Sequence, residues 1–133
     1  MDEDTQIQKS VLLIDDSKYL LGFYADAFRN ANYSVDTALG AAEALRQLQA
    51  KTYRAVIFDV KMVAVPGLQM MEMIKRQNLA QNSVFIILTN ENDPDKMKEA
   101  VTFGINNYFI KSENPPVTFV GKVNQILETK NRI

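Results

Sequence analysis

The strongest constraint on the fold is a regular alternation between short apolar runs and longer amphipathic stretches. The apolar runs predict strands over residues 11–14, 33–37, 54–59, 84–88 and 107–110. Apolar positions at helical spacing predict helices over residues 20–31, 40–48, 68–78, 93–104 and 114–127. Because single strands alternate with single helices, the pattern indicates a parallel sheet with helices on both faces.

The number of strands and the missing motifs narrow this architecture. The chain has 133 residues, which suits one domain, and it lacks the G-x-G-x-x-G and Walker motifs of nucleotide-binding versions of such sheets. We therefore predict an α/β, flavodoxin-like, doubly wound (βα)5 fold with strand order 2-1-3-4-5. The domain is expected over residues 9–133, after a frayed, polar lead-in over residues 1–8.

Composition excludes several classes of function. The chain contains neither histidine nor cysteine, which removes the commonest general base, disulfides and thiolate zinc sites. A net charge of -1 gives no electrostatic case for direct binding to nucleic acid or to a membrane. No apolar stretch approaches the ~20 residues of a membrane span, and the acidic N-terminus is unlike a signal peptide. A cytoplasmic protein is therefore expected.

Four of the five apolar runs lead directly into an acid, a hydroxyl or an amine. These residues are Asp15 and Asp16 after the first run, Asp59 at the end of the third, Thr89 after the fourth and Lys111 after the fifth. Taken singly, each has a structural explanation as a helix cap, a turn residue or a solvated lysine. With strand order 2-1-3-4-5, however, the first and third strands are neighbours, so all five side chains are expected at one crevice.

The chemistry of these five residues points to phosphoryl transfer. Three neighbouring carboxylates repel one another, and a divalent cation with oxygen ligands, such as Mg²⁺, relieves that repulsion. Asp59 can act as a nucleophile and form an acyl phosphate. Lys111 and Thr89 can hold a phosphoryl oxygen, and phosphoryl transfer needs positioning and charge neutralisation more than a histidine base.

The same residues resemble the receiver domain of two-component response regulators. The resemblance covers roughly residues 9–130 and rests on residues 11–17 (VLLIDDS), 58–62 (FDVKM), 67–68 (GL), 88–89 (LT) and 108–111 (YFIK). It implies that Asp59 is the phosphoacceptor and that Asp15, Asp16 and Asp59 bind Mg²⁺, with the backbone carbonyl of Lys61 as a further ligand. It also implies that Thr89 is the switch hydroxyl and that Lys111 pairs with the phosphoryl group.

Further roles follow from the resemblance. Tyr108 matches the aromatic position whose ring turns inward on activation, and Asn90, Lys61 and Glu91 match positions that tune dephosphorylation. The phosphoryl group would come from a sensor histidine kinase or a phosphotransfer protein, and residues 94–130 would bind a downstream protein. A homodimer formed on phosphorylation is also compatible with the resemblance. Such a protein is a switch that catalyses only its own phosphorylation and dephosphorylation.

Three positions depart from the family pattern. Val63 stands where a proline usually follows the methionine, Asn90 stands where a small residue follows the threonine, and Ser112 stands where a proline follows the lysine. We also hypothesise that Lys61 and Glu91 form a salt bridge across the mouth of the site and slow the entry of water.

Two alternatives belong to other functional classes. The first is a pseudo-receiver that keeps the fold as a constitutive protein-interaction module. The second is a hydrolase with an Asp nucleophile, which is disfavoured because Lys61 occupies the position where such an enzyme needs a second acid. Whether the chain is a stand-alone regulator or the receiver of a longer protein stays open.

Overall fold

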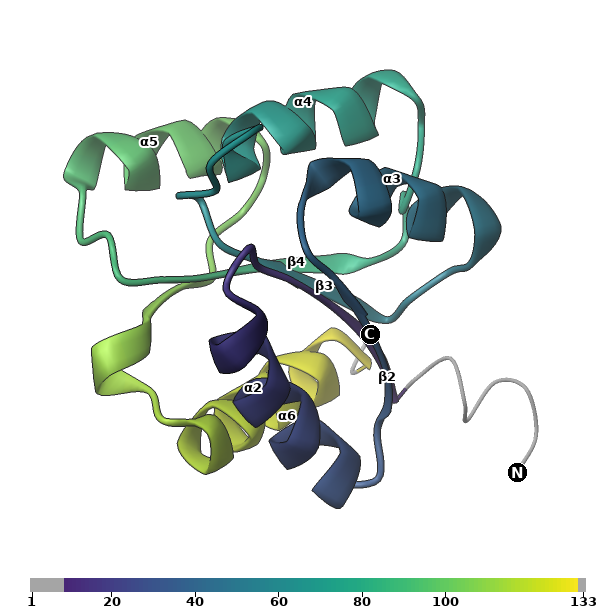
Figure 1. Cartoon of the computed structure of the whole chain (residues 1–133), viewed down its shortest axis with the longest axis vertical. Coiled ribbons are helices and arrows are strands. Elements are labelled where there is room, and N and C mark those ends of the chain that lie inside the picture. Colours follow the sequence, from purple (N-terminus) through teal and green to yellow (C-terminus); the bar gives the residue numbers. More distant parts are fainter. Residues whose placement is uncertain (1–8, 132–133) are drawn as a thin grey trace.

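The computed structural model describes residues 9–131, and the expected lead-in over residues 1–8 lies outside the described residues (Figure 1). The strands are β1 (Ser10–Ile14), β2 (Ser34–Ala38), β3 (Ala55–Phe58), β4 (Val84–Thr89) and β5 (Tyr108–Ile110). The helices are α2 (Lys18–Asn30), α3 (Ala41–Ala50), α4 (Gly67–Arg76), α5 (Pro94–Thr102) and α6 (Pro116–Asn131), with a 3-10 turn, η1 (Lys111–Glu113), between β5 and α6. Every predicted strand and helix is present.

The five strands form one parallel sheet in the order β2-β1-β3-β4-β5, as predicted. Ile14 of β1 pairs with Phe58 of β3, and Phe58 pairs with Ile87 of β4. Thr89, the last residue of β4, pairs with Ile110, the last residue of β5. This register places the carboxyl ends of β1, β3, β4 and β5 at one edge of the sheet.

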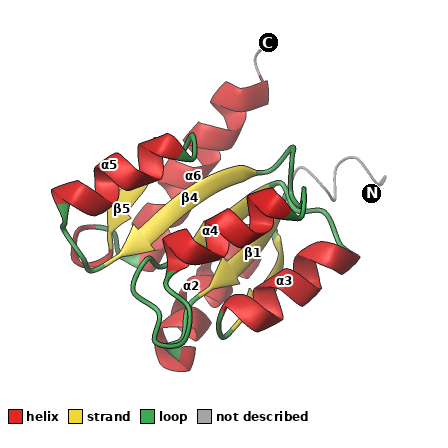
Figure 2. Cartoon of the chain, turned by 90° about the horizontal axis from the view of Figure 1, so that it is seen from above, coloured by secondary structure: helices red, strands yellow, loops and turns green. Residues whose placement is uncertain are grey.

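Helices α3, α4 and α5 cover one face of the sheet, and α2 and α6 cover the other (Figures 1 and 2). Each face has its own apolar core. On the α2–α6 side, Phe119 makes edge-to-face contacts with Phe28 and Tyr24 at ring-centroid distances of 6.0 and 5.7 Å. Burial on both faces explains why β1 and β3 are continuous apolar runs rather than alternating ones.

The ends of the helices use the signals present in the sequence. Asp93 caps α5 by accepting a hydrogen bond from the Asp95 N–H, and Pro94 is the first residue of the helix. Gly104 follows α5 with a φ of 79°, a left-handed conformation that favours glycine. No peptide bond over residues 9–131 is cis, so the bond before Ser112 is trans. Over residues 9–131, none of the helices combines the length and the apolar character that a membrane span requires.

Gly67 lets α4 begin in close contact with the end of β3. A Cβ atom at this position would lie 2.3 Å from the Asp59 carbonyl oxygen and 2.9 Å from the Val60 Cα atom. Both contacts are with main-chain atoms that cannot rotate away. The Gly67 N–H also donates to the Val60 carbonyl at 3.0 Å, which fixes the loop between Asp59 and α4.

We predict that Gly67→Ala lowers the free energy of unfolding by about 1–3 kcal/mol, because the new methyl group must displace the backbone beside Asp59. Gly22→Ala is the matched control: Gly22 lies within α2 with open space around it, so the substitution should stabilise the helix by roughly 0.5–1 kcal/mol. Urea unfolding followed by circular dichroism measures both changes. A Gly67→Ala variant as stable as the native chain would contradict the close approach.

Candidate functional site

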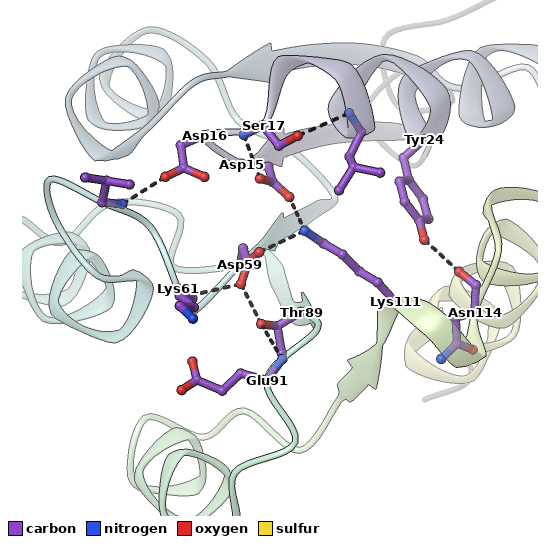
Figure 3. A network of polar contacts seen from close by, with 12 residues as sticks. Asp15, Asp16, Ser17, Tyr24, Asp59, Lys61, Thr89, Glu91, Lys111 and Asn114 are labelled. Atoms are coloured by element: carbon purple, nitrogen blue, oxygen red, sulfur yellow. Dashed lines mark hydrogen bonds and ion pairs between the residues drawn. The ribbon is translucent and has the colours of Figure 1, made fainter.

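Four of the five predicted side chains meet at the carboxyl edge of the sheet (Figure 3). The Lys111 ammonium lies 2.6 Å from Asp15 Oδ2 and 2.8 Å from Asp59 Oδ2. The Thr89 hydroxyl donates to Asp59 Oδ1 at 2.6 Å. Residues at the ends of β1, β3, β4 and β5 are thus joined by direct hydrogen bonds, as the strand order predicts.

The Asp59 carboxylate is buried and held by three donors. It is 6% exposed, and Oδ1 accepts from both the Thr89 hydroxyl and the Lys61 N–H, the latter at 2.9 Å. Oδ2 accepts from Lys111. Hydrogen bonds of this number and polarity offset the cost of removing a carboxylate from water, and they fix its orientation.

Lys111 is as deeply buried as the acids it contacts, with 9% of its side chain exposed. Burial lowers the pKa of the Lys111 ammonium, but the hydrogen bonds and negative charges of Asp15 and Asp59 outweigh burial and raise it above its usual value. The amine is therefore charged at neutral pH and links the two carboxylates.

The two acids after β1 have different environments. Asp15 is buried, and its Oδ1 accepts from the Ser17 N–H at 2.9 Å while its Oδ2 faces Lys111. Asp16 is exposed, and its Oδ2 accepts from the Val63 N–H at 2.9 Å. The expectation that all three acids converge on one point is therefore only partly met. Within the described part of the chain, no three acidic side chains are grouped closely enough to hold one metal ion.

The donor set nevertheless fits a hard divalent cation. Asp15, Asp16 and Asp59 supply only oxygen ligands, and with Lys111 they leave a formal charge of about -2 at the edge of the sheet. Lys111 lies between two of these carboxylates, and the Val63 amide turns the third away.

The mouth of the site is an open cavity of about 410 Å³ lined by Asp59, Lys61, Thr89, Asn90 and Glu91. The ion pairs of residues 9–131 do not include Lys61 with Glu91, so the predicted salt bridge between these two side chains is not formed in this structure. Holding two long side chains at a solvent-exposed mouth costs entropy and gains little Coulomb energy. Both side chains still border the entrance to Asp59.

Tyr108 is connected to the site through Glu91. Its hydroxyl donates to the Glu91 carbonyl at 2.6 Å, and its ring packs against the core beneath α3, α4 and α5. The Glu91 N–H in turn donates to the Thr89 hydroxyl oxygen at 3.2 Å. Burial, followed by the charges of Glu91, Asp93 and Asp59, raises the pKa of the Tyr108 phenol to about 12.

Sequence reasoning missed two residues beside the site, Tyr24 and Asn114. The sequence pattern places Asn114 at the start of the helix predicted over residues 114–127, yet Asn114 is buried and its carbonyl accepts from the Tyr24 hydroxyl at 2.7 Å (Figure 3). The sequence around Asn114 shows only a polar residue between an apolar strand and an apolar helix face. That pattern does not reveal that its partner is Tyr24, 90 positions away.

Comparisons with known proteins agree with this geometry. The family model described as "Response regulator receiver domain" matches residues 11–119. The two-component response regulator ORR6 of Oryza sativa is 23% identical over 116 residues, which cover 85% of this chain and 68% of that protein. The uncharacterized transcriptional regulatory protein YesN of Bacillus subtilis is 31% identical over 108 residues, which cover 78% of this chain and only 28% of that protein.

Solved structures show the same fold. A CheY-like response regulator receiver domain protein from Methanospirillum hungatei superposes with a TM-score of 0.84 at 19% identity, covering 93% of this chain and 97% of that one. The chemotaxis protein CheY4 of Vibrio cholerae gives 0.80 at 26% identity, covering 88% and 97%. Because the family model spans most of the chain, the chain belongs to the response regulator receiver domain family.

Proposed function

We propose that this receiver domain is a phosphoryl-accepting switch in which Asp59 is the phosphoacceptor. The observation that carries the proposal is the position of the Asp59 carboxylate, which is held between the Thr89 hydroxyl and the Lys111 ammonium at the open mouth of the site. The proposed donor is the phosphohistidine of a sensor histidine kinase or a phosphotransfer protein. In the transfer, an Asp59 oxygen bonds to phosphorus as the bond from phosphorus to the donor nitrogen breaks, and the electron pair of that bond returns to the nitrogen.

Asp15, Asp16 and Asp59, with the Lys61 carbonyl, are the proposed holders of Mg²⁺. When bound there, Mg²⁺ would neutralise negative charge on the carboxylates and on the phosphoryl oxygens. Lys111 supplies a positive charge from the other side of Asp59, and Thr89 supplies a hydroxyl donor. These groups favour phosphoryl transfer by neutralising charge and by orienting the reacting atoms, so the transfer needs no histidine as a general base.

The proposed output runs through Thr89, Glu91 and Tyr108. A phosphoryl group on Asp59 competes for the proton that Thr89 donates to Asp59 Oδ1. The Glu91 main chain contacts both the Thr89 hydroxyl and the Tyr108 hydroxyl. A shift of Thr89 would therefore alter the hydrogen bond that holds the Tyr108 hydroxyl and so the position of its ring. The downstream partner, or a second copy of the chain, would bind the surface of α5, β5 and α6, where Val101 and Val117 are exposed.

The decisive experiment adds beryllofluoride and Mg²⁺, which together mimic an acyl phosphate, and follows backbone amide NMR shifts. We expect shifts around Asp59, Thr89 and Tyr108, and their loss in Asp59→Asn. Asp36→Asn is the matched control, because Asp36 is also a strand carboxylate held by a hydroxyl and a lysine, from Tyr53 at 2.6 Å and Lys51 at 3.0 Å. It should respond like the native protein. No response of the native protein would favour the constitutive interaction module.

A second prediction concerns competition between the Lys111 ammonium and Mg²⁺ for the carboxylates of Asp15 and Asp59. In Lys111→Met, Asp15 and Asp59 lose the charge between them, so the affinity for Mg²⁺ should rise by about threefold or more. The rate of phosphorylation by a small-molecule phosphodonor should fall at the same time. Lys51→Met removes a surface ion pair with Asp36 and should change neither quantity. An unchanged affinity in Lys111→Met would show that the ammonium does not oppose cation binding.

A third prediction tests the position of the Tyr108 ring. With ¹³C-labelled tyrosine, Tyr108 should stay mostly protonated at about pH 11, because its pKa is about 12 whereas an ordinary phenol titrates near 10. Glu91→Gln removes a negative charge that raises this pKa, so the titration should move to lower pH. A Tyr108 titration near pH 10 in the native protein would place the ring outside the core.

A further inference from the structure

The segment that carries Lys111 is short and has little regular structure to support it. Lys111 opens the 3-10 turn η1 directly after β5, a three-residue strand that pairs only with β4. Ser112 follows, without the ring that would restrict the backbone at a proline. The contacts of the ammonium at 2.6 and 2.8 Å nevertheless require a well-defined main chain beneath it.

Asn114 fixes the main chain around Lys111 through hydrogen bonds. Asn114 is 3% exposed, and its main-chain N–H, main-chain carbonyl, side-chain amide nitrogen and side-chain oxygen each have a hydrogen-bond partner. Its side-chain amide donates to the Ile110 carbonyl at 2.8 Å, and its main-chain N–H donates to the Lys111 carbonyl at 3.1 Å. Asn114 therefore holds two successive carbonyls, that of Ile110 through its side chain and that of Lys111 through its main-chain N–H.

The remaining two groups attach Asn114 to the helices on that face of the sheet. Its carbonyl accepts from the Tyr24 hydroxyl of α2 at 2.7 Å, and its side-chain oxygen accepts from the Lys122 ammonium of α6 at 2.5 Å. The Tyr24 ring is fixed by its edge-to-face contact with Phe119, and Lys122 lies over the Phe109 ring at 5.7 Å. Burial raises the pKa of the Tyr24 phenol, so the donated proton is retained at neutral pH.

We propose that Asn114 is a positioning residue for Lys111, and that Tyr24 and Lys122 hold it in place. The hydrogen bond between Tyr24 and Asn114 joins α2 to the loop that carries Lys111. Helix α2 begins just after Asp15 and Asp16, and the Lys111 ammonium contacts Asp15 and Asp59. This inference rests on the proposed function in that Lys111 assists transfer to Asp59. Fixing the backbone in advance means that placing the ammonium costs little entropy when the phosphoryl group arrives.

Tyr24→Phe is the cleanest test, because it removes one hydroxyl and leaves the ring that packs against Phe119. Tyr33→Phe is its matched control. The Tyr33 hydroxyl also donates to α6, at the Asn124 side-chain oxygen, but it does not contact the Lys111 loop. Asn114→Ala is the stronger variant, since it removes the contacts to the Ile110 carbonyl and to Lys122 together.

Two readouts are taken on each variant. The first is the rate of phosphorylation by a small-molecule phosphodonor with Mg²⁺, which we expect to fall about three- to tenfold in Tyr24→Phe and further in Asn114→Ala. The second is the ¹⁵N NMR signal of the Lys111 ammonium in the unphosphorylated protein. A lysine amine fixed between two carboxylates exchanges slowly with water and gives a sharp signal, which should broaden in both variants.

Tyr33→Phe should leave both readouts within about twofold of the native protein, even where urea unfolding shows a similar loss of stability. The proposal is overturned if Tyr24→Phe and Asn114→Ala alter the Lys111 signal and the rate no more than Tyr33→Phe does. Should the native protein accept no phosphoryl group, the proposed function fails, while the ammonium signal alone still decides whether Asn114 positions Lys111.

Discussion

The ion pairs of Lys111 with Asp15 and Asp59 determine the rest of the site. Two buried carboxylates at the ends of neighbouring strands repel each other, and one ammonium between them removes that repulsion. Removing either kind of partner from a buried pair leaves an uncompensated charge, which is far costlier than the pair itself. The chain therefore has to bring the ends of β1, β3 and β5 to one place and keep them there.

Most of the site residues are positioned by the sheet, and Lys111 is positioned mainly by a loop. Asp59 and Thr89 stand at the ends of β3 and β4, strands with a neighbour on each side, so their positions follow from the register. Lys111 follows the short edge strand β5 and gains less from the sheet. The hydrogen bonds of Asn114 compensate for this at the one place where strand pairing is weakest.

This difference also explains what could be predicted from the sequence. Strand order and the gathering of Asp15, Asp59, Thr89 and Lys111 follow from periodicity and from the rule that parallel strands present their carboxyl ends together. The outward turn of Asp16 toward the Val63 amide and the missing Lys61–Glu91 pair depend on side-chain rotamers at the surface. The Tyr24–Asn114 bond depends on a contact between distant segments, which no local pattern encodes.

The main chain of Glu91 is the proposed route by which a change at Thr89 would reach Tyr108. Its N–H donates to the Thr89 hydroxyl oxygen, and its carbonyl accepts from the Tyr108 hydroxyl. Since the Thr89 hydroxyl has one proton, it cannot donate fully to Asp59 and to a phosphoryl oxygen at once. In the proposed switch, a shift of Thr89 toward a phosphoryl oxygen would weaken or move its contact with the Glu91 N–H, next to the carbonyl that accepts from Tyr108. The backbone of Glu91 would thereby connect the proposed chemistry at Asp59 to the Tyr108 ring, which packs against the core on the α3–α5 side of the sheet.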